Sequence, residues 1–242
     1  MTKFSFTVPT AHIDEFDQYQ DFFFGLSFLL TDPTYERYFR RKCEDGSLVY
    51  LDNSYNETLT PLPPHELARL WEKYRPTAVI SPDSDYWSPS EAVEAFEVLK
   101  RLMPARNIMC AFRSDTEREY FEANGLGPLA VSYFWVEANE ITKRGLDKVH
   151  SLGLPSLAAI RANRPPTLDT SQMVKLAVRG YKLEDWLADG GIREKHVSRA
   201  VDAERSKRQA RAEEFFNMSL TDAQLELTVH NLQALKAYAN DH

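Results

Sequence analysis

The strongest constraint on the fold is a repeated alternation of short apolar runs and amphipathic stretches over the first 180 of the 242 residues. The run 48–51 reads LVYL, whereas 64–74 places its apolar residues at the spacing of one helical face. Strands that alternate with helices at this interval predict a parallel sheet with right-handed crossovers. Counting the run 4–8 and the ambiguous run 22–30, seven or eight such units are expected.

The element boundaries follow from turn and capping residues. Asp32 before Pro33 is typical of a helix start, because aspartate caps a helix and proline suits its first position. The stretch FFFGLSFLL at 22–30 cannot be assigned by periodicity. The predicted strands are 4–8, 48–51, 77–80, 107–112, 129–133, 148–150 and 167–168, and the predicted helices are 33–43, 64–74, 90–103, 115–123, 137–144, 155–162 and 172–178.

This pattern predicts the α/β class. No glycine-rich phosphate loop follows the first strand, which disfavours a Rossmann or P-loop fold. A (β/α)8 TIM-type barrel with a C-terminal helical extension fits best, and a doubly wound sheet is the alternative. Gly190-Gly191 divides the chain into a catalytic barrel domain, 1–190, and a helical extension, 191–242, which holds a charge-dense stretch and an amphipathic helix at 220–240.

Composition excludes several classes. The chain has 29 basic and 36 acidic residues, a net charge of −7, which argues against a nucleic-acid partner because phosphate binding depends on Lys and Arg. Cys43 and Cys110 are too few for a disulfide scaffold or a four-thiolate zinc site. The apolar run 22–30 is far shorter than the roughly 20 residues that span a bilayer. We therefore expect a cytoplasmic protein with no leader segment and no membrane partner.

The candidate chemistry lies in polar residues that follow the strands, because a barrel active site is built at the carboxyl ends of its strands. These residues are Asp52, Asp83, Asp85, Asp169, His12, Arg113 and His150. Four acids at one mouth need a cationic partner, a metal or raised pKa values. The alternative is structural: aspartate after a strand also caps the next helix, and a strand-end histidine is often a satisfied core residue.

One stretch resembles a known family. Residues 147–180 contain HSLGL at 150–154, LDTS at 168–171 and Arg179-Gly180, and are similar to the late-barrel segment of the tRNA-guanine transglycosylase superfamily. LVYLDNSYNE at 48–57 and VISPDSDYW at 79–87 resemble two further strands of that family. The resemblance covers roughly residues 1–190 and is nearest to the compact, zinc-free, phage-type barrels.

The resemblance implies a glycosyltransferase of the pentosyltransferase type that exchanges or modifies a guanine-type base in nucleic acid. Asp169 would attack the anomeric carbon, Asp52 would act as general acid/base, and Asp83 would accept hydrogen bonds from the purine. No cofactor and no catalytic metal are implied. Further substrate-binding candidates are Asp85, His12, Asn53, Arg113, His150 and Trp135, the last as a base-stacking residue or a core aromatic.

The chain departs from the family in two places. It lacks the Cys-rich zinc site, and PLAVSYFWV at 128–136 is bulkier than the glycine-rich loop of the family's base pocket. DNA is therefore expected rather than tRNA, together with a free purine or 7-deazapurine base; a homodimer is left open. The compartment would be the host cytoplasm if the chain is phage-encoded.

The tail supplies a local positive charge. Residues 193–211 contain seven basic and three acidic residues, a net charge of +4, and Arg205, Lys207 and Arg208 are the predicted nucleic-acid-binding residues. A solvated mixed-charge helix is the alternative. Two other functions stay open: a metal-dependent barrel enzyme acting on a small phosphorylated or nucleotide substrate, and a non-catalytic nucleic-acid-binding descendant.

Overall fold

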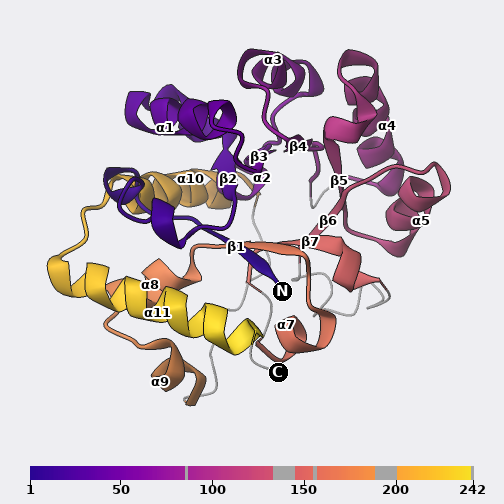
Figure 1. Ribbon diagram of the computed structural model, residues 1–242. Coiled ribbons are helices and arrows are strands. Elements are labelled where there is room, and N and C mark those ends of the chain that lie inside the picture. The colour runs from indigo at the N-terminus through magenta and orange to yellow at the C-terminus, as the bar shows by residue number, and fades with distance from the viewer. Residues whose placement is uncertain (85–86, 133–144, 155–156, 189–200, 241–242) are drawn as a thin grey trace.

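The computed structural model describes residues 1–84, 87–132, 145–154, 157–188 and 201–240, with no side chains between 201 and 206. The described residues form eight parallel strands in the order β1-β8-β7-β6-β5-β4-β3-β2, with helices around them (Figure 1). This nearly circular order is that of an α/β TIM-type barrel, so the predicted fold is confirmed and the doubly wound sheet is excluded.

The strands are short and buried. Every pair of neighbours in the sheet is parallel, with registers such as Ser5 opposite Asp169 in the pair of β1 and β8. The strands are β1 Lys3–Phe6, β2 Phe23–Leu26, β3 Val49–Asp52, β4 Ala78–Ile80, β5 Ile108–Phe112, β6 Leu129–Ser132, β7 Val149–Leu152 and β8 Thr167–Thr170.

The helices follow the predicted stretches closely, and the bounds of α3, α5 and α8 are those predicted. The α-helices are α1 Pro33–Glu44, α2 Tyr55–Thr58, α3 Pro64–Tyr74, α4 Pro89–Leu102, α5 Asp115–Ala123, α7 Leu157–Asn163, α8 Gln172–Val178, α9 Leu183–Ala188, α10 Val201–Asn217 and α11 Asp222–Asn240. Short 3-10 helices are η1 Thr10–His12, η2 Asp17–Tyr19, η3 Ser27–Thr31, η4 Ala105–Asn107 and η5 Leu146–Lys148. The predicted helix 137–144 lies outside the described residues.

Capping explains where α1 begins. The Asp32 side chain accepts hydrogen bonds from the backbone N–H groups of Thr34 and Tyr35, at 2.8 and 2.9 Å. These bonds satisfy two of the amides that a helix leaves unpaired at its start. The predicted cap is therefore confirmed.

The ambiguous run 22–30 divides into a strand and a 3-10 helix. Gly25 in β2 allows α1 to approach closely, because a Cβ atom there would lie 2.5 Å from the ring of Phe39. The amide of Leu26, the last residue of β2, then donates to the Tyr35 hydroxyl of α1 at 2.9 Å, and η3 follows. Contacts with α1, which periodicity does not reveal, fix this segment.

The barrel closes between β1 and β2 through hydrogen bonds that involve side-chain oxygens, whereas the other neighbouring strands pair through their backbones. Asp21 Oδ2 accepts from the Phe4 amide at 2.9 Å, and the Asp21 amide donates to the Phe4 carbonyl at 2.8 Å. Ser5 Oγ accepts from the Phe24 amide at 2.9 Å. Side-chain oxygens thus take the place of part of a strand ladder at this seam.

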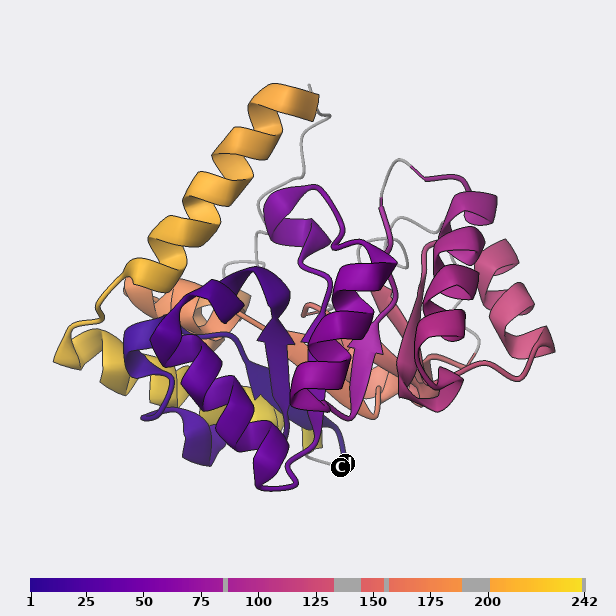
Figure 2. The same cartoon turned by 90° about the horizontal axis from the view of Figure 1, so that it is seen from above.

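The C-terminal helices pack on the barrel at different places. Helix α11 contacts α7, α8 and α9 and buries Leu232 and Leu235, and Thr221 caps it by exchanging hydrogen bonds with Gln224. Helix α10 contacts α2 and η1 and projects from one end of the barrel, whereas both termini lie at the other end (Figure 2). Among the described helices, none is both long and apolar enough to cross a membrane.

Candidate active site at the carboxyl end of the barrel

The carboxyl ends of the strands bring the predicted acids together. Asp52 is the last residue of β3, and Asp169 lies within β8. Both acids therefore belong to strands, whereas the sequence analysis placed them just after the strands. Asp83 follows β4. The charges of Asp83 and Asp169 both act on Asp52 and raise its pKa, which places the three acids in one cluster.

Asp83 is held by its neighbours on both carboxylate oxygens. Arg113, which follows β5, donates from Nε to Asp83 Oδ2 at 3.0 Å and from Nη2 to the same oxygen. Asn53 Nδ2 donates to Asp83 Oδ1 at 2.7 Å and to the Ser81 carbonyl at 2.9 Å. The Arg113 guanidinium also lies over the Tyr55 ring, 4.9 Å from its centroid. Asp83, Arg113 and Asn53, all predicted site residues, therefore form one bonded group in which Asp83 already has partners.

Asp52 lies in different surroundings. It is buried, and its Oδ2 accepts a hydrogen bond from the Ser54 amide at 2.8 Å. Burial raises the pKa of Asp52 well above its ordinary value, and the charges of Glu57 and Asp83 raise it further. The protonated form of Asp52 is therefore favoured more than that of an exposed aspartate.

The sequence prediction missed Glu57. It lies in α2, five positions after Asp52, within the quoted stretch LDNSYNE but outside the strand-end positions considered there. Burial raises the pKa of Glu57 to about 7, and Asp169 contributes to the rise, while Lys175 of α8 opposes it. Its Oε2 is buried and has no hydrogen-bond partner among the described residues. An acid one helical turn beyond a strand end was the signal that could have found it.

His150 supports Asp169 from inside the barrel. The ring is 2% exposed and stacks on Phe24 at 5.3 Å between centroids. Its Nδ1 lies 2.8 Å from Thr167 Oγ1, and its Nε2 lies 3.3 Å from Asp169 Oδ1 without hydrogen-bond alignment. Asp169 Oδ1 accepts from the Gly153 amide at 3.1 Å. Two residues that were predicted separately are thus brought together, with His150 as a buried core residue next to Asp169.

Other predicted site residues lie elsewhere. His12 is in η1, where its Nε2 accepts from the Leu220 amide at 2.9 Å and its Nδ1 lies 3.2 Å from Glu15 Oε2, so it anchors the C-terminal segment. Asp85 and Trp135, and the side chain of Arg205, lie outside the described residues. In α10, Lys207 is exposed, whereas Arg208 reaches toward Asn56 of α2.

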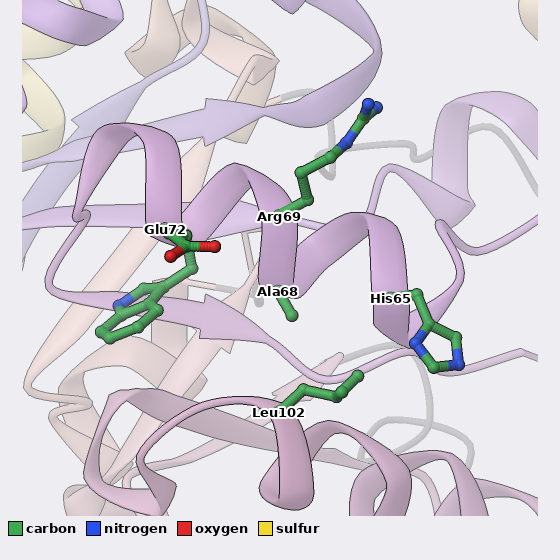
Figure 3. Close-up of a pocket in the computed structure, with 6 residues that line it drawn as sticks. His65, Ala68, Arg69, Glu72 and Leu102 are labelled. Atoms are coloured by element: carbon green, nitrogen blue, oxygen red, sulfur yellow. The ribbon is translucent and has the colours of Figure 1, made fainter.

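No group of three or more His, Cys, Asp or Glu in the described part of the chain is placed to hold a metal ion. A hollow of about 290 Å³ lies on the outside of the barrel between α3 and α4, where Leu102 faces Ala68 (Figure 3). Its lining comes from two surface helices, so it is separate from the acidic cluster. The lining residues are His65, Ala68, Arg69, Trp71, Glu72 and Leu102.

The cluster thus combines three kinds of acid. The pKa of Asp52 is raised well above its ordinary value, the pKa of Glu57 is raised to about 7, and Asp83 forms an ion pair with Arg113. A site with these groups can donate and accept protons.

Comparison with known proteins gives limited similarity. No family model matches the chain, and no curated protein matches it either. Among solved structures, the chain is similar to N-acetylneuraminate lyase from Mycoplasma synoviae, with 13% identity and a TM-score of 0.49. The match covers 90% of this chain and 97% of the lyase chain.

This comparison corrects the expected family. No family model matches the chain, and the similar solved structure is named as a lyase. These findings do not support the assignment to the tRNA-guanine transglycosylase superfamily, the base exchange in nucleic acid or the glycosyltransferase class, and we withdraw these three predictions. The physical reason lies in the motifs: polar residues at the end of a strand are common turn and site residues in any α/β barrel, so they do not identify one family. No observation tests the nucleic-acid, free-base or homodimer partners, which stay predictions.

Proposed function

We propose that this protein is an enzyme that moves protons to and from a small polar substrate at the carboxyl end of the barrel. Glu57 is the group that exchanges its proton with the substrate, and Asp52 is a proton donor beside it. The observation that carries this proposal is the buried, unpartnered Oε2 of Glu57 next to other acids in the described part of the chain. A buried polar atom without a partner costs free energy in the folded protein, so a retained one indicates use.

The state of Glu57 supports this role. A general acid or base is most effective when its pKa lies near the working pH, because both protonation states are then populated. The pKa of Glu57 is raised to about 7 by burial and by Asp169. A carboxyl group that only caps a helix does not need a pKa near 7.

Asp52 and Asp169 have complementary roles. Asp52, whose pKa is raised by burial and by Glu57, donates a proton to a developing negative charge on the substrate. Asp169 accepts from the Gly153 amide and lies beside His150, so its carboxyl group is held in place next to the other acids. Asp83 and Arg113 form an ion pair that contributes polar groups to the side of this site.

Lysine-based imine chemistry receives no support from the described strands. Their one lysine is Lys3, which is exposed at the start of β1, whereas the acids lie at the carboxyl ends of the strands. Schiff-base formation requires a lysine amine at the reacting carbon. Lys175 of α8, a helix residue, acts on Glu57 through its charge and lowers the pKa of that acid. The carboxyl groups are the proton-transfer groups of this proposal.

Substitution of the two acids tests the proposal. Small polar compounds that stabilise the wild-type chain thermally are assayed for turnover and for exchange of their hydrogens with deuterated solvent. Glu57→Gln and Asp52→Asn should each lower kcat by about 10²–10⁴-fold, the usual contribution of general acid–base catalysis. Glu119→Gln changes an exposed glutamate of α5 and is the matched control. Turnover by Glu57→Gln at the wild-type rate would contradict the proposal.

A further inference from the structure

We propose that His150 is a positioning residue for Asp169. Thr167 donates its hydroxyl proton to Nδ1 of the imidazole, so that the neutral ring carries its own proton on Nε2 and presents it to Asp169 Oδ1. The role of this arrangement in turnover rests on the proposed function, whereas the arrangement itself can be tested without a substrate. It gives a role to a histidine that the sequence predicted as a substrate-binding residue.

Strand geometry brings the three side chains together. Thr167 and Asp169 are two residues apart in β8, so their side chains lie on the same face of that strand. In the neighbouring strand β7, Ser151 lies opposite Leu168, which places His150 beside Thr167. The imidazole therefore meets a hydroxyl group and a carboxyl group. Its Nδ1 lies 2.8 Å from Thr167 Oγ1, and its Nε2 lies 3.3 Å from Asp169 Oδ1.

Packing keeps the imidazole in this orientation. The His150 side chain is 1% exposed and stacks on the Phe24 ring, with 5.3 Å between centroids. The rings of Phe22 and Tyr50 meet it edge-on, at 5.9 and 5.5 Å between centroids. Nε2 is buried and makes no hydrogen bond within the described part of the chain. The polar side chains of β8 are therefore the groups that decide which nitrogen carries the proton.

These contacts select one tautomer of the neutral ring. A neutral imidazole has one N–H donor and one acceptor nitrogen. With the proton on Nδ1, the lone pair of Nε2 would face the Asp169 carboxylate oxygen across 3.3 Å, an unfavourable contact between two acceptors. With the proton on Nε2, the N–H faces the carboxylate, and Nδ1 accepts from the Thr167 hydroxyl, which can donate as well as accept.

The same oxygen of Asp169 also accepts from a second donor. The Gly153 amide, in the turn that follows β7, donates to Oδ1 at 3.1 Å. The two donors hold the carboxyl group by one oxygen, and Oδ2 is the oxygen left for a substrate. The charge of Asp169 raises the pKa of Glu57, so the placement of this carboxyl group affects the acid that exchanges its proton in the proposed function.

The Tyr50 hydroxyl is another group near Thr167. Burial raises the pKa of Tyr50, and the Thr167 side chain lowers it. A hydroxyl oxygen has two acceptor lone pairs besides its one proton, so Thr167 can accept from Tyr50 and still donate to Nδ1 of His150. The presence of Tyr50 is therefore compatible with this tautomer.

The experiment reads the tautomer by NMR in the full chain labelled with 15N-histidine. Long-range 1H–15N correlation at pH 8, above the ordinary pKa of histidine, distinguishes the nitrogen that carries a proton from the one that does not. The His150 signals are assigned by their loss in His150→Phe. Wild type should show the proton on Nε2. Asp169→Leu should raise the ratio of the Nδ1–H form to the Nε2–H form by about tenfold, the effect of losing the partner of one buried N–H.

The control is Asp147→Asn, which changes an exposed acid just before β7 and should leave the ratio unchanged. A proton on Nδ1 or on both nitrogens in the wild-type chain would overturn the inference. An unchanged ratio in Asp169→Leu, or an equal change in Asp147→Asn, would overturn it as well. If Asp169→Leu does not fold, the wild-type tautomer decides by itself.

Turnover gives a second readout. His150→Phe keeps a ring but has no donor, and it should lower kcat by up to about 10²-fold with little change in KM, the effect of a small misplacement of a reacting group. His150→Gln, whose amide can donate at the place of Nε2, should recover part of this loss, and equal losses in the two variants would overturn the positioning role. The Nε2–H tautomer together with a fully active Glu57→Gln would refute the proposed function and leave the arrangement of His150 intact.

Discussion

Asp52, Glu57 and Asp83 are three carboxyl groups of one cluster with three different surroundings. Asp83 has Arg113 and Asn53 on its two oxygens, Asp52 has one backbone amide, and Glu57 has a buried oxygen with no partner among the described residues. Charge partners favour ionisation of a carboxyl group and burial opposes it, so neighbouring carboxyl groups can differ in their pKa. Under the proposed function, Asp52 is the proton donor and Glu57 is the exchanging group. Sequence position identified two of these acids but not their states, because a pKa depends on neighbours from other strands.

The raised pKa of Glu57 has a consequence for stability. The pKa is about 7 in the folded protein against 4.5 for an unperturbed glutamate, so between these pH values the folded protein holds a proton that the unfolded chain has released. The contribution of Glu57 to the free energy of unfolding therefore falls as the pH rises from about 4.5 to about 7.

Glu57→Gln removes this dependence. The variant should gain free energy of unfolding relative to wild type at pH 8 compared with pH 4, on the order of 3 kcal/mol. Urea unfolding at the two pH values measures the difference, with Glu119→Gln as the exposed control. A pH-independent difference between wild type and Glu57→Gln would show that Glu57 titrates normally.

At the scale of the elements, local signals placed helices better than they placed the ends of strands. The bounds of α3 and α5 were predicted because their apolar spacing lies between clear breakers. By contrast, β3 extends through Asp52 and β8 through Thr170, since pairing with neighbouring strands decides where a strand ends. The contacts of α10 and α11 with the barrel elements were also not specified by their periodicity.

Asn231 fixes α11 to the barrel helices. It is fully buried, its Oδ1 accepts from the Leu183 amide at 2.8 Å, and its Nδ2 donates to the Tyr181 carbonyl at 3.1 Å. Asn231→Leu leaves the buried Leu183 amide without this partner and also removes the bond to the Tyr181 carbonyl, so the free energy of unfolding should fall by about 2–4 kcal/mol. Urea unfolding measures the loss. Gln233→Leu, at an exposed position of the same helix, should change stability by less than about 0.5 kcal/mol, and an equal loss there would contradict the role of Asn231.

At the scale of the whole molecule, the barrel is not uniform around its circumference. The seam between β1 and β2 uses Asp21 and Ser5 side chains, and Lys236 of α11 reinforces Asp21 with a contact of 2.8 Å to its Oδ1. Side-chain bonds at a seam need fewer residues to move than a backbone ladder does, so local opening should begin there.

Native-state hydrogen exchange tests this difference. The Phe24 amide, bonded to Ser5 Oγ, should exchange about tenfold faster than the Cys110 amide, which is also in a buried residue and donates to the Pro128 carbonyl at 2.9 Å. Ser5→Ala should accelerate exchange at Phe24 and leave Cys110 unchanged. Equal protection of the two amides in the wild-type chain would show a barrel without a weak seam.

The sequence by itself determined the class of fold, most helices and the acids at the strand ends, because spacing, caps and breakers act over a few residues. The tertiary structure decided the states of those acids, the inclusion of Glu57, and the place of His12 and Arg208 beside segments distant in the chain. The strand-end motifs are features of an α/β barrel and do not identify one family. Burial and charge partners come from residues far apart in sequence, and local patterns cannot specify them.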